Sequence, residues 1–310
     1  MLYLKGRLDQ CVNSYFERKN KMTNNFVLLT DSSADLNVAL QEELDVEVMP
    51  LTVSVDGGDY IPGNELDIKC FYDSLRLGKS ATTSAINLDT AIVAMEKYLS
   101  DGKDLLYVAF SSGLSSTAQT GKLAADELRE KYPDRKIFVV DSLCASLGQG
   151  LLVYYASQLR NEGKSIEEVR DWLESNKLNL CHWFTVDDLH HLKRGGRVSA
   201  ATAVVGTMLS IKPVLHVDNE GHLINVSKAR GRKPSIQALA AKLGETGIGD
   251  PADQVIYISH GDCIEDAEYL AGIIREKYNP KKIVIGYVGA VIGAHSGPGT
   301  LALFFLGKER

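Results

Sequence analysis

Short apolar runs alternate with helical segments through the first half of the chain. Phe26–Thr30, Leu105–Phe110 and Lys136–Val140 have the length and mostly apolar character of strands that are buried on both faces, and Ala118–Lys131 has helical composition. Parallel strands need long crossover connections, which are usually helices packed on the faces of the sheet. The alternation therefore predicts an N-terminal α/β domain over residues 26–164, with a mostly parallel sheet between layers of helices.

The second half has a different pattern. Ser165 and Glu168 form a capping-box sequence that opens a helix. Ile211–Val217 and His222–Ala229 flank a turn sequence and predict a hairpin, which brings antiparallel pairing into this half. We therefore expect a second α/β domain over residues 165–310, packed closely on the first because no low-complexity linker separates them. Residues 1–25 are expected to be an N-terminal extension.

Composition and charge exclude several classes of protein. The chain of 310 residues has a formal net charge of −6 and no basic stripe interleaved with aromatic residues, so nucleic acid is not an expected partner. No apolar run approaches the roughly 18 residues that a membrane span needs. The five cysteines are scattered without a C-x-x-C pair, which suits reduced thiols in the cytoplasm. No cluster has metal-ligand spacing, so neither a metal nor a cofactor is expected.

A turn rich in hydroxyl groups stands between a predicted strand and a predicted helix. Five of the seven residues Ser111–Thr117 are serine or threonine. A helix N-terminus offers unpaired N–H groups and a partial positive charge, so it can bind a carboxylate or a phosphate. The alternative is that these residues only cap the helix. Asp31–Ser33 ends another predicted strand, and in an open parallel sheet such turns meet at one edge.

Glycine-rich segments of the second half carry histidine and arginine side chains. Gly293–Thr300 holds His295 among three glycines and a proline, which predicts a loop with an exposed imidazole beside a ligand. Lys193–Arg197 and Ala229–Lys233 place arginines beside glycines in an otherwise acidic chain. Such runs either receive an anionic partner or are solvated faces. The chain has no P-loop and no dinucleotide-binding motif after the first strand, so no nucleotide site is expected.

Eight motifs together resemble the DegV family, in chain order from about Phe26 to the C-terminus. They are Asp31–Leu36, Thr82–Ser84, Ser111–Thr117, Asp141–Ser142, Leu192–Arg197, Ile211–Pro213, Arg230–Lys233 and Ile292–Thr300. The resemblance implies two α/β domains with a long-chain fatty acid between them, its carboxylate at a polar end and its alkyl chain in an apolar tunnel. It also implies a non-catalytic protein that presents the fatty acid to a separate ATP-dependent kinase subunit, which forms an acyl phosphate.

The same resemblance assigns roles to individual residues. Thr83, Ser112 and His295 match the positions that bind the carboxylate, and Ser84 and Ser111 are additional candidates for this site. The segment from Thr83 departs from the family, because Thr-Ser-Ala-Ile-Asn replaces the usual Thr-Ser-Gln-Pro-Ser and is expected to make a looser turn.

Arg197 and Arg230 match arginines that the resemblance associates with kinase docking and phosphate transfer. Two other functions remain open. One is lipid binding or transport without a kinase partner. The other is a hydrolase using Ser112 and His295, although the chain has no G-x-S-x-G elbow and no acid obviously placed to orient the histidine.

Overall fold

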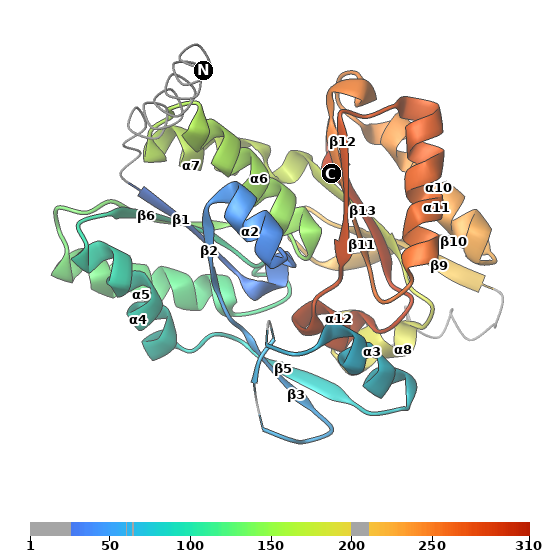
Figure 1. The fold of residues 1–310 in the computed structure, drawn as a ribbon, viewed down its shortest axis with the longest axis horizontal. Helices are drawn as coiled ribbons and strands as arrows, with labels where there is room; N and C mark the ends of the chain where they lie inside the picture. Colours follow the sequence, from blue (N-terminus) through green and yellow to red (C-terminus); the bar gives the residue numbers. More distant parts are fainter. Residues whose placement is uncertain (1–25, 60, 64, 200–210) are drawn as a thin grey trace, which may run out of the picture.

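The computed structural model describes residues 26–59, 61–63, 65–199 and 211–310, whose strands form three sheets (Figure 1). The predicted extension over residues 1–25 lies outside the described residues. The N-terminal sheet has the order β2-β1-β6-β7, and all of its strands are parallel. Its strands are β1 (Phe26–Asp31), β2 (Val46–Met49), β6 (Asp104–Ala109) and β7 (Ile137–Asp141).

Alternate residues of these strands are buried against helices on opposite faces. Leu28 and Val108 join the core on one face, and Leu29 and Tyr107 join the core on the other. The first face is covered by α2 (Val38–Leu44), α6 (Leu147–Asn161) and α7 (Ile166–Asn176), and the second by α4 (Leu88–Ser100) and α5 (Thr117–Lys131). The predicted parallel sheet between two helical layers is confirmed.

A small antiparallel sheet interrupts this pattern. The extended stretch 46–55 divides between β2 and β3. The small sheet has the order β4-β3-β5 and consists of β3 (Thr52–Val55), β4 (Ile61–Pro62) and β5 (Ala81–Ser84). Helix α3 (Ile68–Arg76) follows β4, and its Tyr72 hydroxyl donates to the Val288 carbonyl over 2.7 Å. This part of the first half therefore packs on the second half of the chain.

The C-terminal sheet is mixed, with the order β10-β9-β8-β13-β11-β12. Only β11 and β12 pair in parallel among its described strands, and β9 and β10 form the predicted hairpin. The predicted capping box of Ser165 and Glu168 is present at the start of α7. The elements of this half are β8 (Leu180–Thr185), α8 (Leu189–Arg194), β9 (Ile211–Val217), β10 (Leu223–Arg230), α10 (Arg232–Thr246), β11 (Val255–His260), α11 (Ile264–Tyr278), β12 (Lys282–Tyr287), α12 (Ala290–Ser296) and β13 (Leu301–Leu306).

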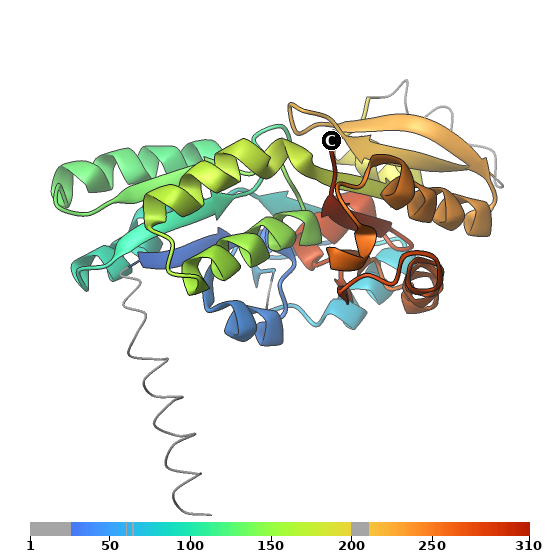
Figure 2. The same ribbon diagram turned by 90° about the horizontal axis from the view of Figure 1, so that it is seen from above.

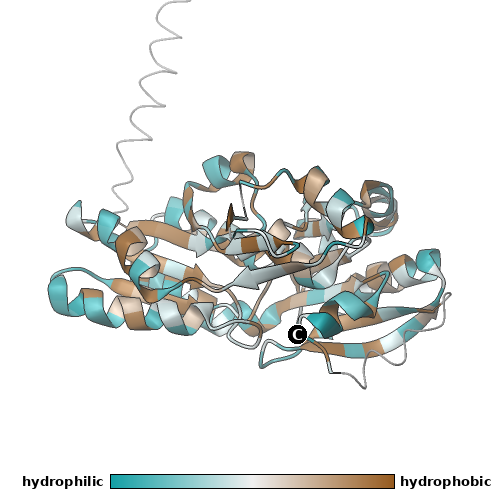
Figure 3. Ribbon diagram, turned by 90° about the horizontal axis from the view of Figure 1, so that it is seen from below, coloured by the Kyte–Doolittle hydropathy of each residue, from teal (hydrophilic) through white to brown (hydrophobic). Residues whose placement is uncertain are grey.

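Helix α6 joins the two large sheets into one core. It contacts β1 and β6 of the N-terminal sheet and β8, β11 and β13 of the C-terminal sheet (Figure 1, Figure 2). Leu28, Phe184 and Phe304 accordingly belong to the same buried cluster. Colouring by hydropathy shows apolar residues concentrated along the strands of both halves (Figure 3). The division at residue 164 stays a prediction, and α7, which follows it, packs on β6 and β7.

Candidate functional site

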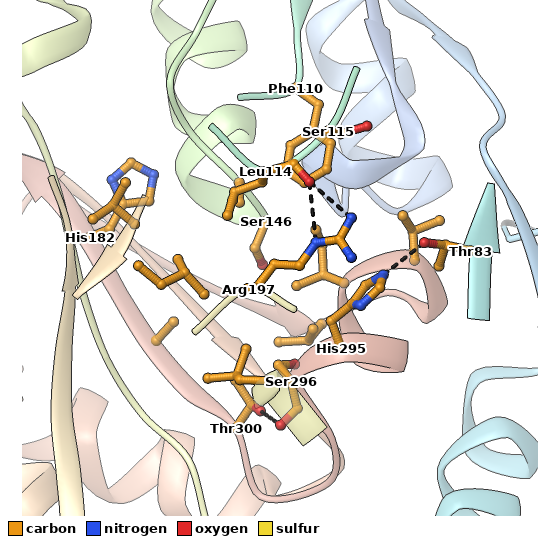
Figure 4. Close-up of a pocket in the computed structure, with 18 of the residues that line it drawn as sticks. Thr83, Phe110, Leu114, Ser115, Ser146, His182, Arg197, His295, Ser296 and Thr300 are labelled. Atoms are coloured by element: carbon orange, nitrogen blue, oxygen red, sulfur yellow. Dashed lines mark hydrogen bonds between the residues drawn. The ribbon is translucent and has the colours of Figure 1, made fainter. Parts of the chain in front are cut away.

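A cavity lies where the small sheet, α12, the start of α6 and the C-terminal sheet meet (Figure 4). Its volume, counted as the space that the centre of a water molecule can occupy, is about 180 Å³. Most of its wall is apolar, as expected for a site that binds a hydrocarbon group. The apolar lining residues are Leu51, Ala85, Phe110, Leu114, Ala145, Phe184, Leu192, Val217, Leu223, Val288, Val291, Ile292, Ala302 and Phe304.

One end of this cavity carries a group of polar side chains. Thr83 of β5 lies opposite His295 of α12, and Thr83 Oγ1 is 2.7 Å from His295 Nε2 (Figure 4). Arg197, which follows α8, and Ser115, which precedes α5, line the cavity beside them. Residues far apart in the sequence therefore converge here because α12 packs on β5 and on α8.

His295 is not on an exposed loop, and this part of the sequence-based expectation is wrong. Residues Ala290–Ser296 form α12, and the imidazole is half-buried, with Nδ1 against the backbone of Gly195. Glycine at position 195 permits this approach, since a Cβ there would lie 2.3 Å from Nδ1. Burial, together with the charge of Arg197, lowers the pKa of His295 to about 4. The ring is therefore neutral at pH 7.

Arg197 brings a positive charge that no acidic side chain of the described residues balances. Its Nε and Nη2 donate to the Leu114 carbonyl over 3.2 and 3.0 Å, and its Nη1 donates to the Gly195 carbonyl. Burial lowers the pKa of Arg197, and no described carboxylate acts against that effect. Arginine keeps its charge in proteins, and two of its five N–H groups are not used in these bonds. This end of the cavity therefore carries a positive charge with unused N–H donors.

The serines of the turn Ser111–Thr117 have different surroundings. Ser112 is exposed and does not line the cavity, and its backbone N–H donates to Asp141. Ser111 is buried and donates to the Gly221 carbonyl over 3.1 Å, so it fixes the turn to the β9–β10 hairpin. The serines of this turn that line the cavity are Ser115 and Ser116.

Ser115 also bonds to the first residue of the helix that follows, whose N-cap residue is Ser116. Ser115 Oγ accepts the N–H of Thr117 and is 2.8 Å from Thr117 Oγ1. The residue that lines the cavity thus also bonds to the first residue of α5, and ligand binding by this turn stays a prediction. The sequence indicates Ser115 by its position just before the helix, because the last serines before a helix lie closest to the free N–H groups of its first turn.

The polar strand end at Asp31 shapes the turn rather than lining the cavity. Its buried carboxylate accepts from the Tyr107 hydroxyl over 2.8 Å and from the Phe110 N–H over 2.9 Å. Burial raises the pKa of Asp31, and its hydrogen bonds act against that effect. Asp31 thus holds the end of β6, from which the hydroxyl turn begins.

The last two predicted residues, Ser84 and Arg230, differ in their position relative to the cavity. Ser84 is exposed and lines the cavity next to Thr83. Arg230 ends β10, the edge strand of the C-terminal sheet, and its exposed side chain does not line the cavity.

A second polar group in the cavity was not predicted. Ser146 Oγ is 2.9 Å from Ser259 Oγ and donates to Asp35 over 2.5 Å. Burial raises the pKa of Asp35 to about 8. Ser146 has a φ of 55° and a ψ of −151°, a backbone conformation rarely adopted by residues other than glycine and held here by these bonds. His182 of β8 also lines the cavity.

Two other kinds of feature are absent from the described residues. Nowhere in that part of the chain do three or more His, Cys, Asp or Glu side chains converge as metal ligands. None of its helices combines the length and apolar character required to span a membrane.

Known proteins resemble this chain over most of its length. The family model described as "Uncharacterised protein, DegV family" matches residues 25–308. The DegV domain-containing protein CPE0026 of Clostridium perfringens is 51% identical over 287 residues, which cover 92% of this chain and 98% of that protein.

Solved structures extend the likeness to the fold. A DegV family protein from Thermus thermophilus, described by its fatty acid binding, superposes with a TM-score of 0.82 at 30% identity, covering 91% of this chain and 99% of that one. DegV of Bacillus subtilis, described as a fatty acid binding protein, gives a TM-score of 0.80 at 29% identity, covering 92% and 100%. The matched residues span both sheets and the cavity, and the chain belongs to the DegV family.

Proposed function

We propose that this protein binds a long-chain fatty acid in the cavity, with its carboxylate at the end formed by Thr83, Ser115, Arg197 and His295. The observation that carries the proposal is a half-buried arginine that has no acidic partner among the described residues, at one end of a largely apolar cavity. The fatty acid binding described for the relatives from Thermus thermophilus and Bacillus subtilis supports it.

Each polar residue has a part in holding the carboxylate. A carboxylate removed from water needs both opposite charge and hydrogen-bond donors, and Arg197 supplies the charge. When the proton of the neutral His295 ring is on Nε2, the ring donates to Thr83 Oγ1. The Thr83 hydroxyl then donates to the ligand, and the Ser115 hydroxyl is a second donor. We assign to Ser115 the role that the resemblance gave to the exposed Ser112.

The apolar wall supplies most of the affinity. Burying a hydrocarbon chain contributes roughly 0.8 kcal/mol for each methylene group, so a long chain contributes on the order of 10 kcal/mol before the costs of association. A few polar contacts then orient the acid and select it against a neutral chain of equal length.

We further propose that a separate ATP-dependent kinase phosphorylates the bound acid. A carboxylate oxygen forms a bond to the γ-phosphorus of ATP while the bond from that phosphorus to ADP breaks. Arg197 offsets the charge on the reacting oxygens, and the exposed Arg230 contacts the kinase. The absence of a nucleotide motif in the sequence supports a partner that supplies the ATP site.

The binding test compares palmitate with hexadecanol, which has the same chain without the acid. We expect palmitate to bind the parent protein more tightly, and Arg197→Gln to weaken palmitate by about 10- to 150-fold, the range for hydrogen bonds to a charged group. Thr83→Val should weaken palmitate about tenfold, whereas Thr52→Val, in the same small sheet but outside the cavity lining, should not. Equal affinity of the parent protein for acid and alcohol would contradict the proposal.

The remaining alternatives have separate tests. For the kinase, acyl phosphate formation is measured with a purified ATP-dependent fatty acid kinase subunit, and Arg230→Ala should lower it without changing palmitate affinity. Unchanged phosphorylation removes the docking role, and no phosphorylation of the parent protein favours lipid transport.

A hydrolase with Ser112 is disfavoured because this residue is exposed and His295 Nε2 faces Thr83. Turnover of an acyl ester that is lost in Ser112→Ala would restore it.

A further inference from the structure

The hairpin turn between β9 and β10, residues 218–222, lies between the cavity and the solvent. Val217 ends β9, Leu223 begins β10, and both line the cavity. Asn219 and Glu220, at the tip between them, are exposed. The hairpin turn therefore covers this side of the cavity, and the end of the chain lies beside it (Figure 2).

The hairpin turn can move as one unit. Asp218 Oδ1 accepts the N–H groups of Glu220 and His222 over 3.0 and 2.8 Å, so bonds within the turn keep its shape. Strand β10 lies at the edge of its sheet, and a bulge between Asn225 and Ser227 interrupts its pairing with β9. A bulge bends its strand, so the hairpin turn can swing outward from this point.

The hairpin turn packs on the turn Ser111–Thr117 of the first half. Ser111 Oγ donates to the Gly221 carbonyl over 3.1 Å. A Cβ added to Gly113 would lie 2.6 Å from the Glu220 carbonyl oxygen, and a Cβ added to Gly221 would lie 2.2 Å from Ser111 Oγ. Glycine at both positions permits this close approach of two backbones, so the two turns fit closely.

Arg310 ties the hairpin turn to the rest of the molecule. Its Nη1 donates to the Asp218 carbonyl over 3.0 Å and to the Leu143 carbonyl over 2.8 Å. Its Nε and Nη2 donate to groups outside the hairpin turn, which are the Leu180 and Lys177 carbonyls and Cys144 Sγ. All five N–H groups of the guanidinium are therefore used, and they join separate segments of the chain.

We propose that the hairpin turn is a lid over the cavity and that Arg310 is the latch that holds it closed. The other bonds of Arg310 fix its guanidinium, and the bond to the Asp218 carbonyl reaches the lid. When the lid swings outward, the cavity opens between Val217 and Leu223, and a fatty acid can enter or leave. This path rests on the proposed function, whereas the latch does not.

The latch is tested without a ligand, through the accessibility of a thiol beneath the lid. Ser111 is buried under the hairpin turn, so the thiol of Ser111→Cys reacts with iodoacetamide when the lid opens. Adding Arg310→Ala should speed the alkylation of residue 111 by about 10- to 150-fold, the range for one hydrogen bond to a charged group. Peptide mass mapping separates residue 111 from the native cysteines.

Two controls separate opening of the lid from a general loss of stability. Ser157→Cys places a thiol at another buried serine that donates to a backbone carbonyl, that of Leu44, outside the cavity lining. Its alkylation should not change when Arg310→Ala is added. Arg129→Ala removes an arginine that donates to the Ile137 carbonyl of β7, and it should leave the alkylation of residue 111 unchanged.

Arg310→Lys is the milder variant should alanine prevent folding. It keeps the positive charge but offers three N–H donors instead of five, so it should speed the alkylation of residue 111 less than alanine does. Equal alkylation of residue 111 with arginine, lysine and alanine at position 310 overturns the latch. An equal rise at residues 111 and 157 also overturns it, because general unfolding then explains both.

Ligand exchange tests the path through the lid. The association and dissociation rates of cis-parinarate, a fluorescent fatty acid, are measured by stopped flow, and Arg310→Ala should raise both about tenfold while Arg129→Ala changes neither. Faster alkylation of residue 111 with unchanged rates of exchange overturns the path and supports the latch. No binding of cis-parinarate by the parent protein overturns the proposed function, and the alkylation result still decides the latch.

Discussion

Gly148 provides the sharpest test of how closely the cavity wall is packed. It is the second residue of α6 and lies against the rings of His182 and Phe304. A Cβ at this position would lie 2.3 Å from His182 Nε2 and 2.8 Å from Phe304 Cδ1, far inside normal contact distance. Gly148→Ala therefore forces two buried rings or the helix to move.

The size of the effect follows from two opposing contributions. Alanine in place of glycine favours a helix by up to about 1 kcal/mol. An added methyl group in a packed core costs about 1 to 3 kcal/mol, and the short distances to two rigid rings indicate the upper part of that range. We expect Gly148→Ala to lower the free energy of unfolding by about 2 kcal/mol.

Gly272 of α11 is the matched control, because it is exposed in a helix and a Cβ there would meet nothing within 4 Å. Gly272→Ala should raise the free energy of unfolding by about 1 kcal/mol, which leaves a difference of about 3 kcal/mol between the two variants. Urea unfolding followed by circular dichroism measures both. Gly148→Ala as stable as the parent protein would refute the close packing described for this wall.

Three further predictions concern the polar end and the contact between the halves. Ser115→Ala should weaken palmitate binding about three- to tenfold while Ser112→Ala leaves it unchanged, as measured by ligand-displacement titration. If only Ser112→Ala weakened binding, the carboxylate contact would belong to Ser112 instead of Ser115. The pKa of His295 is about 4 in the folded chain and 6.5 in the free side chain. Between pH 6.5 and pH 4 the unfolded state therefore binds more protons than the folded state. The free energy of unfolding should accordingly fall as the pH is lowered through this range. His295→Gln should lessen this fall in urea unfolding at pH 7, 5.5 and 4.5, and an identical pH dependence in both proteins would contradict the low pKa. Tyr72→Phe should lower the free energy of unfolding by about 1 to 2 kcal/mol, because it leaves the Val288 carbonyl without its donor, and an unchanged urea midpoint would show that this bond contributes nothing.

Much of the fold could be predicted from local patterns. Continuous apolar runs such as Leu105–Phe110 identified the parallel strands, and turn residues after Val217 identified the hairpin. The small sheet was not predicted, because β3 and β5 are four residues each and pair across a long sequence separation. Pro50, between β2 and β3, was the local sign that the extended stretch changes sheets.

The candidate site was less accessible to sequence reasoning. Thr83 and His295 were selected together by resemblance, and the structure brings them within hydrogen-bond distance. The turn Ser111–Thr117 was recognised, but which serines face the cavity depends on how the turn leaves the sheet. No motif in the sequence singles out His182, which lies in a mostly apolar strand. Its unpaired nitrogen becomes evident only from its three-dimensional neighbours.

The packing of α3 and the small sheet on α12 has a consequence for how the chain unfolds. Residues 52–84 belong to the first half of the sequence but pack on α12 of the second half. The buried cluster between them therefore contains residues of both halves. Residues 165–310 produced alone would expose Val291 and Ala294 of α12, and residues 26–164 alone would expose Phe71. The two halves of the chain should therefore unfold in a single cooperative transition rather than one after the other.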